Sequence, residues 1–255
     1  MDLRIRGKVA LVTGASAGIG EAVALALARE GVRLAVSARR RDRLEEVARR
    51  ALAEGAEQAR AFTADQTDTG SLQALTASVE QELGPVDILI VNGGGPKPGS
   101  FTQTPAADWD AAYALTLQSA LQLVRAVLPG MRARGWGRIV ALESVVVKQP
   151  FPGMVLSNAF RASVAAALKT LSSEVAAEGV TVNTIATGLV DTDRFRKLYD
   201  TPAKVAAAVA AVPIQRPATP AEYAPLVVFL CGVPAGYVTG QTLSIDGGLT
   251  AGIFG

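Results

Sequence analysis

Short apolar runs alternate along the chain with longer stretches in which apolar residues recur every three or four positions. The runs predict buried parallel strands, and the longer stretches predict amphipathic helices. We expect strands at residues 8–12, 33–37, 59–64, 86–91, 137–142, 180–184 and 241–245. We expect helices at residues 19–30, 42–53, 71–83, 106–134, 154–178 and 220–230, with a break near Trp109 and one or two short helices within 193–212.

This alternation predicts an α/β fold. We expect a single-domain, Rossmann-type, doubly wound parallel sheet of about seven strands with helices on both faces. The length of 255 residues suits one such domain over residues 1–255, and no internal repeat or linker-like segment interrupts it. The Ala-rich segment 189–215 is predicted to form a lid over the substrate.

Composition and charge exclude several classes of function. A formal net charge of +2 is too small to favour nucleic acid or an anionic membrane as a partner. The chain has no histidine and one cysteine, Cys231, so we expect no Ser-His-Asp triad, no disulfide and no metal site. No signal peptide is visible and no run approaches about 18 apolar residues, so we expect no membrane span and a cytoplasmic location.

The first predicted strand leads directly into a glycine-rich turn that opens a helix. The turn reads Thr13-Gly14-Ala15-Ser16-Ala17-Gly18-Ile19-Gly20. Gly14 permits a sharp turn, Gly18 lets the backbone approach a phosphate, and Gly20 lets the helix pack closely on the strand. The helix N-terminus favours an anion. A dinucleotide pyrophosphate is therefore predicted here; a glycine turn without a ligand is the less consistent alternative, given the place between strand and helix.

The turn and four further segments, in the same order, resemble the short-chain dehydrogenase/reductase family, most closely its 3-oxoacyl-acyl-carrier-protein reductases and glucose-dehydrogenase-like members. These segments are Val91-Asn92-Gly93-Gly94-Gly95, GRIVALES ending at Ser144, Asn183 to Gly188 with Thr in place of Pro, and TPAEYAPLVVFL followed by VTGQTLSIDGG. The resemblance covers nearly the whole chain. It implies a set of cofactor-binding residues: Gly14, Ser16, Gly18, Ile19, Gly20, Asp65, Gln66, Asn92, Gly93, Gly188, Val190 and Thr192.

The end of the second predicted strand indicates which dinucleotide is bound. The position at which an acid would bind the 2′-hydroxyl of NAD is Ala38, and Arg39-Arg40-Arg41 follows. Three arginines at a helix start oppose the helix dipole unless an anion lies among them. This favours NADP(H) over NAD(H), with Arg39 the first candidate and Arg40 the second, and a solvated basic cluster as the alternative. Asp65 resembles the residue that receives the adenine amino group, a role compatible with capping the next segment.

The catalytic pattern of the family is altered. The resemblance implies a Ser, a Tyr-x-x-x-Lys pair and an Asn; here Ser144 is retained, whereas Ser157, Arg161 and Thr116 replace Tyr, Lys and Asn. A serine hydroxyl is far less acidic than a phenol, whose pKa is about 10. Arginine keeps its proton and cannot relay it.

Two neighbours of Ser144 are of interest. Lys148 follows on a loop that should overhang the substrate, where it is either an acid, a binder of an acidic group, or an ordinary loop lysine. Strand alternation predicts that Glu143 points away from the site. Tyr113 and Tyr199 could reach a cleft, but packing roles are favoured for both.

Two interpretations follow. The first is an NADP(H)-dependent oxidoreductase acting on a small-molecule carbonyl or alcohol, with a proton relay built from Ser144, Ser157 and Arg161 together with water or Lys148. The alternative is a catalytically inactive dinucleotide-binding pseudoenzyme or sensor. The first is favoured because the variant helix stays polar at Ser157, Asn158 and Arg161. The resemblance also implies a homodimer or homotetramer.

Overall fold

All seven strands are parallel and follow the order β3-β2-β1-β4-β5-β6-β7 in the computed structural model, which describes residues 1–253. They are β1 (Val9–Thr13), β2 (Arg33–Ala38), β3 (Gln58–Thr63), β4 (Ile88–Val91), β5 (Gly137–Ser144), β6 (Val180–Thr187) and β7 (Thr242–Ile245). The predicted fold class and all seven predicted strands are confirmed. Strands β5 and β6 run further than predicted, so that Ser144 lies within the sheet, paired with Thr187.

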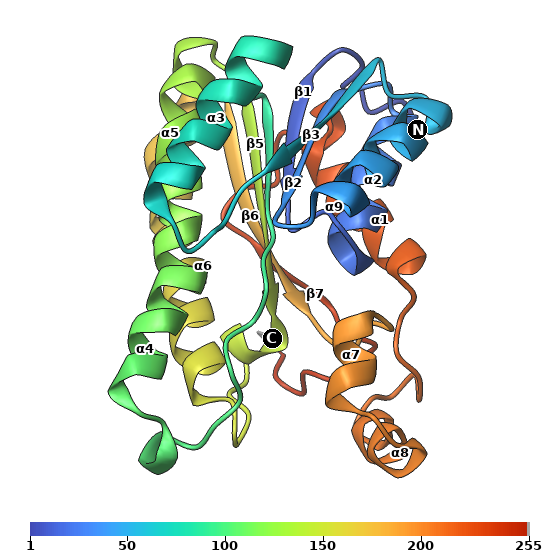
Figure 1. The fold of residues 1–255 in the computed structure, drawn as a ribbon, viewed down its shortest axis with the longest axis vertical. Coiled ribbons are helices and arrows are strands. Elements are labelled where there is room, and N and C mark those ends of the chain that lie inside the picture. Colours follow the sequence, from blue (N-terminus) through green and yellow to red (C-terminus); the bar gives the residue numbers. More distant parts are fainter. Residues whose placement is uncertain (254–255) are drawn as a thin grey trace.

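Helices cover both faces of this sheet (Figure 1). Their bounds are α1 (Gly18–Arg29), α2 (Arg41–Glu54), α3 (Thr69–Leu83), α4 (Ala106–Ala112), α5 (Ser119–Ala133), α6 (Val155–Val175), α7 (Asp193–Leu198), α8 (Pro202–Ala210) and α9 (Pro220–Cys231). Helices α1, α2 and α9 pack on one face, and α3, α5 and α6 pack on the other.

The strands are apolar on both sides because each side meets a helical layer. In β5, Val140 and Leu142 belong to the core shared with α1 and α9, while Ile139 and Ala141 belong to the core shared with α5 and α6. This two-sided burial fixes the direction of every side chain in β5. The next residue on the α6 side of the strand is Glu143.

The long predicted helix over residues 106–134 is irregular at a different place from the one expected. Helix α4 and helix α5 are joined by a π-helical segment, Tyr113–Gln118, and the backbone at Trp109 is regular α-helix. The prediction of a break near Trp109 was therefore wrong. π-Helical turns occur frequently at functional sites, and this one contains the buried Thr116.

The same helical stretch, Ala106–Ala133, is long and apolar enough to cross a bilayer by length and composition alone, with a mean hydropathy of 1.2. In the structure its apolar side supplies Leu123, Val124 and Met131 to the core beneath α3 and α6. Those contacts are typical of a core helix in an α/β domain.

The segment predicted as a lid leaves the sheet after β6 and carries two short helices, α7 and α8, which lie together at one end of the molecule (Figure 1). Its two ends are held together by a short parallel bridge. Asp191 N donates to Ala218 O at 2.8 Å, and Ala218 N donates to Leu189 O at 2.9 Å. The segment is therefore a closed excursion from the sheet, and its role as a lid stays a prediction.

Candidate functional site

The glycine turn between β1 and α1 has the close backbone packing that the sequence predicts. Gly14 has φ +61°, and a Cβ added to it would lie 2.7 Å from Asn92 Nδ2. Gly18 has φ +62° and faces Thr192 Cγ2, while a Cβ on Gly20 would collide with Gly14 O. Only glycine fits at these three positions. The structure therefore brings the predicted residues of the turn together with Asn92 and Thr192.

Asn92 stabilises the turn directly. Its Nδ2 donates to Thr13 O at 3.1 Å and to Gly14 O at 3.2 Å, which fixes the backbone at the end of β1. Gln66 Nε2 donates to Asn92 O at 2.7 Å. A Cβ on Gly93 would meet Gln66 Oε1 at 2.5 Å. Asn92, Gly93 and Gln66 thus form one layer behind the turn and hold its shape.

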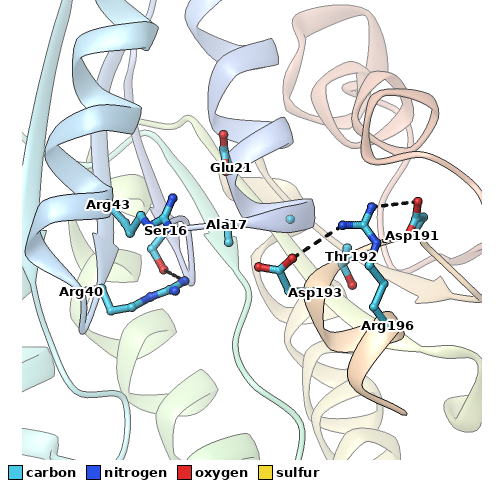
Figure 2. Close-up of a pocket in the computed structure, with 10 residues that line it drawn as sticks. Ser16, Ala17, Glu21, Arg40, Arg43, Asp191, Thr192, Asp193 and Arg196 are labelled. Carbon is cyan, nitrogen blue, oxygen red and sulfur yellow. Dashed lines mark hydrogen bonds and ion pairs between the residues drawn. The ribbon is translucent and has the colours of Figure 1, made fainter. Parts of the chain in front are cut away.

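A pocket of about 230 Å³ lies between the glycine turn and α7. Its lining comes from the turn, the start of α2 and the start of the predicted lid (Figure 2): Ser16, Ala17, Gly18, Glu21, Arg40, Arg43, Asp191, Thr192, Asp193 and Arg196. Arg40 Nη2 donates to Ser16 Oγ at 3.1 Å across the turn. Thr192 caps α7 by accepting a hydrogen bond from Phe195 N at 3.2 Å.

The remaining predicted cofactor residues have packing roles around this pocket. Ile19 packs against the core of the α1 face, and Val190 is buried at the base of the predicted lid, where it bridges to Ala218. A Cβ on Gly188 would lie 2.6 Å from Asp246 Cα, so glycine is required where β6 leaves the sheet beside the chain that follows β7.

The arginines that follow β2 fall into two groups. Arg41, Arg49 and Arg50 form ion pairs with Glu45, Glu46 and Glu21. Arg39, Arg40 and Arg43 have no carboxylate within 4.0 Å anywhere in residues 1–253. Uncompensated positive charge therefore remains beside the glycine turn, where the donor set fits an additional phosphate.

Asp65 is engaged with its own turn. Its Oδ1 accepts from Thr67 N at 2.9 Å and from Thr67 Oγ1 at 2.8 Å. These hydrogen bonds, the backbone one first, lower the pKa of Asp65, and the positive charge of Arg39 adds to the effect. Asp65 thus stabilises the turn before α3, while Asp68 is the N-cap of that helix; recognition of an adenine amino group stays a prediction.

The predicted catalytic residues come from β5 and α6. Ser144 ends β5, is half-buried, and accepts a long hydrogen bond of 3.4 Å from Val146 N. Ser157 is buried in the first turn of α6, and Arg161 follows four residues later on the same side of the helix. The register of α6 therefore places Ser157 and Arg161 in line.

Arg161 forms a buried ion pair with Glu143. Its Nη1 donates to Glu143 Oε2 at 2.7 Å, and the two side chains are 12% and 4% exposed. The expectation that Glu143 points away from the site was wrong, because the α6 side of β5 is the side from which Arg161 approaches. Burial raises the pKa of Glu143, and the charge and hydrogen bond of Arg161 oppose that rise.

A second arginine, Arg194 from α7, lies at the same place. A Cβ added to Gly95 would collide with Arg194 Nη2 and would come within 3.3 Å of Arg161 Nη2. The sequence analysis did not identify Arg194 as a site residue, and it placed Glu143 outside the site. The signal for Glu143 was a charge in an otherwise apolar strand, which requires a buried partner. No local pattern marks Arg194, since its contact with Gly95 spans the fold.

Lys148 lies apart from this cluster. It is half-buried and lines a different hollow, of about 1010 Å³, together with Leu243 on β7 and Thr250. Thr116 is buried in the π-helical segment, and its Oγ1 has no hydrogen-bond partner among the described residues. The structure does not connect either of them to Ser144 by a hydrogen bond.

None of the four tyrosines lies in hydrogen-bond contact with the predicted catalytic residues within residues 1–253. Tyr113 packs against Phe160 and Tyr199 against Phe195, in agreement with the packing roles expected for them. Tyr223 is fully buried, and its hydroxyl pairs with Thr187 Oγ1 at 2.6 Å. Tyr237 is fully exposed. Within the described part of the chain, no tyrosine forms a hydrogen bond with Ser144, Ser157 or Arg161.

Comparisons with known proteins agree with the parallel α/β fold described above. Residues 14–250 match the family model described as enoyl-(acyl carrier protein) reductase. Nodulation protein G of Azospirillum brasilense is 37% identical over 247 residues, covering 95% of this chain and 98% of that protein. The 3-oxoacyl-[acyl-carrier-protein] reductase of Vibrio cholerae is 35% identical over 247 residues, covering 97% and 99%. L-sorbose reductase from Gluconobacter frateurii, solved with NADPH and L-sorbose, superposes with a TM-score of 0.94 at 32% identity, covering 99% and 100%.

Proposed function

Because the chain belongs to the short-chain dehydrogenase/reductase family, we propose that it is an NADP(H)-dependent oxidoreductase that interconverts a carbonyl and a hydroxyl group on a small molecule. The observation that carries this proposal is the ion pair between Arg161 and Glu143. It keeps a fixed positive charge at the carboxyl ends of the strands, one residue from Ser144. Burying two charges has an unfavourable desolvation cost, which favours a functional role for the pair over simple packing.

The cofactor part of the proposal rests on the glycine turn and on the unpaired arginines. The backbone amides of Gly14 to Gly20 and the start of α1 would hold the pyrophosphate. Arg39, Arg40 and Arg43 would hold the 2′-phosphate that distinguishes NADP(H) from NAD(H). The NADPH bound to the L-sorbose reductase supports this choice of cofactor.

The chemistry then divides between the cofactor and the chain. A bound NADPH would supply a hydride to a carbonyl carbon. The Ser144 hydroxyl would donate a hydrogen bond to the carbonyl oxygen, and Arg161 would stabilise the negative charge that develops on it. The same oxygen must also receive a proton. Since Arg161 keeps its protons, the Ser157 hydroxyl passes on a proton that water supplies.

The relatives define which substrates to test. The reductase of Vibrio cholerae is named for a 3-oxoacyl thioester, and the Gluconobacter frateurii enzyme for a ketose. A panel of 3-oxoacyl thioesters, ketoses, simple ketones and oxo acids covers these chemistries. A dinucleotide sensor without turnover is the second candidate, favoured by the absence of a phenol at Ser157.

The test is steady-state oxidation of NADPH over this panel, together with NADPH binding measured by fluorescence titration. The wild-type protein is compared with Ser144→Ala and with a Ser144→Ala/Arg161→Ala double variant whose folding is checked by circular dichroism. We expect turnover that both changes reduce. Tight NADPH binding with no turnover above the double variant on any substrate would reject the enzyme and support the sensor.

We also infer a homodimer or homotetramer. An aromatic cluster centred on Trp109 of α4 and Phe160 of α6 reaches the surface. Its outer members, Phe101 before α4 and Tyr113 after it, are 73% and 45% exposed. Exposed aromatic side chains of this kind are typical of interfaces. The buried, unpaired thiol of Cys231 suits the cytoplasmic location that we propose.

A further inference from the structure

Two guanidinium groups from different parts of the chain meet over one glycine. Arg161 lies on α6, and Arg194 lies on α7 in the predicted lid, yet both would touch a side chain placed on Gly95. Gly95 follows β4, so the two arginines converge at the carboxyl end of the sheet. Like charges converge in this way at small separation only where negative charge offsets them.

Within residues 1–253, Glu143 is the one carboxylate that pairs with either arginine, and it contacts only Arg161. Glu143 Oε2 accepts from Arg161 Nη1, while Arg161 Nη2 faces Gly95. Arg194 donates only a 3.4 Å hydrogen bond to Gly95 O and has no carboxylate within 4.0 Å in residues 1–253. Its neighbour Arg196, on the same short helix, is paired with both Asp191 and Asp193. The cluster therefore carries one positive charge more than its own residues balance.

The surroundings of Arg194 reflect the same excess of positive charge. Partial burial and, after it, the positive charge of Arg161 lower the pKa of Arg194. The residue as a whole remains exposed to solvent although its guanidinium is partly buried. Each guanidinium carries N–H donors in a planar fork that a carboxylate can accept bidentately.

We propose that Arg161 and Arg194 together bind a carboxylate of the substrate, so that the protein acts on a short oxo acid rather than on a neutral ketone. This inference rests on the proposed oxidoreductase function, because it places the carboxylate next to the carbonyl that Ser144 receives. The carboxylate would neutralise the excess charge and bridge α6 to α7. Substrate binding would thereby hold the segment 189–215 against the body of the domain.

Anionic oxygens at this place have a second source, which is the diphosphate of the cofactor. The two sources are distinguished by measuring two ligands on the same variants. A role toward the cofactor predicts that loss of Arg194 weakens NADPH binding. A role toward the substrate predicts that NADPH binding is unchanged and that binding of a carboxylate ligand is weakened.

The experiment is isothermal titration calorimetry of the NADPH-loaded protein with oxamate, an unreactive oxo acid analogue, and with neutral oxamide. The variants are Arg194→Gln, Gly95→Ala, which would displace the Arg194 guanidinium, and the control Lys197→Gln. The control removes the same charge from α7 at an exposed position. We expect oxamate to bind more tightly than oxamide, and Arg194→Gln to weaken oxamate about 10-fold or more. Gly95→Ala should follow Arg194→Gln, and Lys197→Gln should follow the wild type.

Equal binding of oxamate and oxamide would overturn the inference, and so would an Arg194→Gln effect confined to NADPH. Calorimetry does not depend on turnover, so the two proposals fail separately. Oxamate binding without turnover of any substrate would reject the oxidoreductase and leave the anion site standing. Turnover of neutral ketones without preference for oxo acids would reject the anion site alone.

Discussion

Arg161 Nη1 on α6 donates a 2.7 Å hydrogen bond to Glu143 Oε2 on β5, one residue before Ser144. The pair joins the helix that carries Ser157 to the strand that carries Ser144. Two complementary charges therefore meet at the carboxyl end of the sheet, where both side chains are buried. The geometry of the proposed relay depends on this interaction.

We expect Glu143→Leu to destabilise the protein by about 3–5 kcal/mol, because it leaves the Arg161 charge buried without a partner. The two side chains are 12% and 4% exposed, so solvent screens the pair only weakly. The double variant Glu143→Leu/Arg161→Leu should lose much less stability than the single one. Urea unfolding of the four proteins of this cycle measures the coupling; additive effects would contradict a coupled pair.

Placing the Tyr-x-x-x-Lys pair of the family at positions 157 and 161 should create a proton relay that uses a phenol. In Ser157→Tyr/Arg161→Lys we expect kcat for the best carbonyl substrate to rise about 100-fold or more, since general acid catalysis contributes that much. The matched control is Ser157→Phe/Arg161→Lys, which has the ring and the lysine but no hydroxyl. Equal rates for the two variants would show that the frame around α6 no longer positions a phenol.

The arginines after β2 should differ in their effect on cofactor choice. Arg40→Ala and Arg39→Ala are each expected to weaken NADPH about 10-fold while leaving NADH unchanged, because only NADPH has the 2′-phosphate. Arg41→Ala is the control, since its guanidinium is already paired with Glu45 at 2.8 Å. Fluorescence titration with both dinucleotides makes the comparison. An unchanged ratio of the two affinities in Arg39→Ala and Arg40→Ala would reject this assignment.

Gly14→Ala should damage both stability and cofactor binding. The residue has φ +61°, and the new methyl group would lie 2.7 Å from Asn92 Nδ2 and 2.8 Å from Asn92 O. We expect a loss of about 1–3 kcal/mol in unfolding free energy. Gly70→Ala is the control, because Gly70 lies in the first turn of α3, where alanine favours the helix. Retention of full NADPH affinity in Gly14→Ala would contradict the role of the turn.

Glu222 should make stability depend on pH at the acid end. Hydrogen bonds from Arg216 and, after it, from Thr219 lower the pKa of Glu222 to about 2. A depressed acid stabilises the fold above its unfolded pKa near 4.5, and that contribution disappears as pH falls toward 2. The stability difference between wild type and Glu222→Gln should therefore be largest above pH 4.5 and shrink below it. Urea midpoints at several pH values provide the measurement.

The strands and the glycine turn could be predicted because their signals are local. An apolar run, a glycine at a fixed spacing and a following helix each lie within a few residues. The end of β5 could not be predicted in this way. A charged residue such as Glu143 predicts that the strand ends at Leu142. In the structure the strand continues to Ser144, and the charge of Glu143 is neutralised by Arg161, 18 residues later in the chain.

The candidate site could likewise be predicted from the sequence only where its signals are local. Gly14, Gly18 and Gly20 follow one another in sequence, and the contacts of this turn with Asn92 and Thr192 are present in the structure. The meeting of Arg194 with Arg161 over Gly95 depends on where α7 lies after its excursion from β6. A contact between segments 99 residues apart is set by the tertiary packing of the predicted lid rather than by any short pattern.

The hydrogen bonds between Leu189, Asp191 and Ala218 close the predicted lid at its base. The segment between them enters and leaves the domain at neighbouring points, and its Thr192 and Arg194 reach back to Gly18 and Gly95. A replacement segment that keeps the two end residues and these two side chains would preserve the attachment to β6 and α9. New substrate preferences could then be introduced by grafting one contiguous stretch of chain.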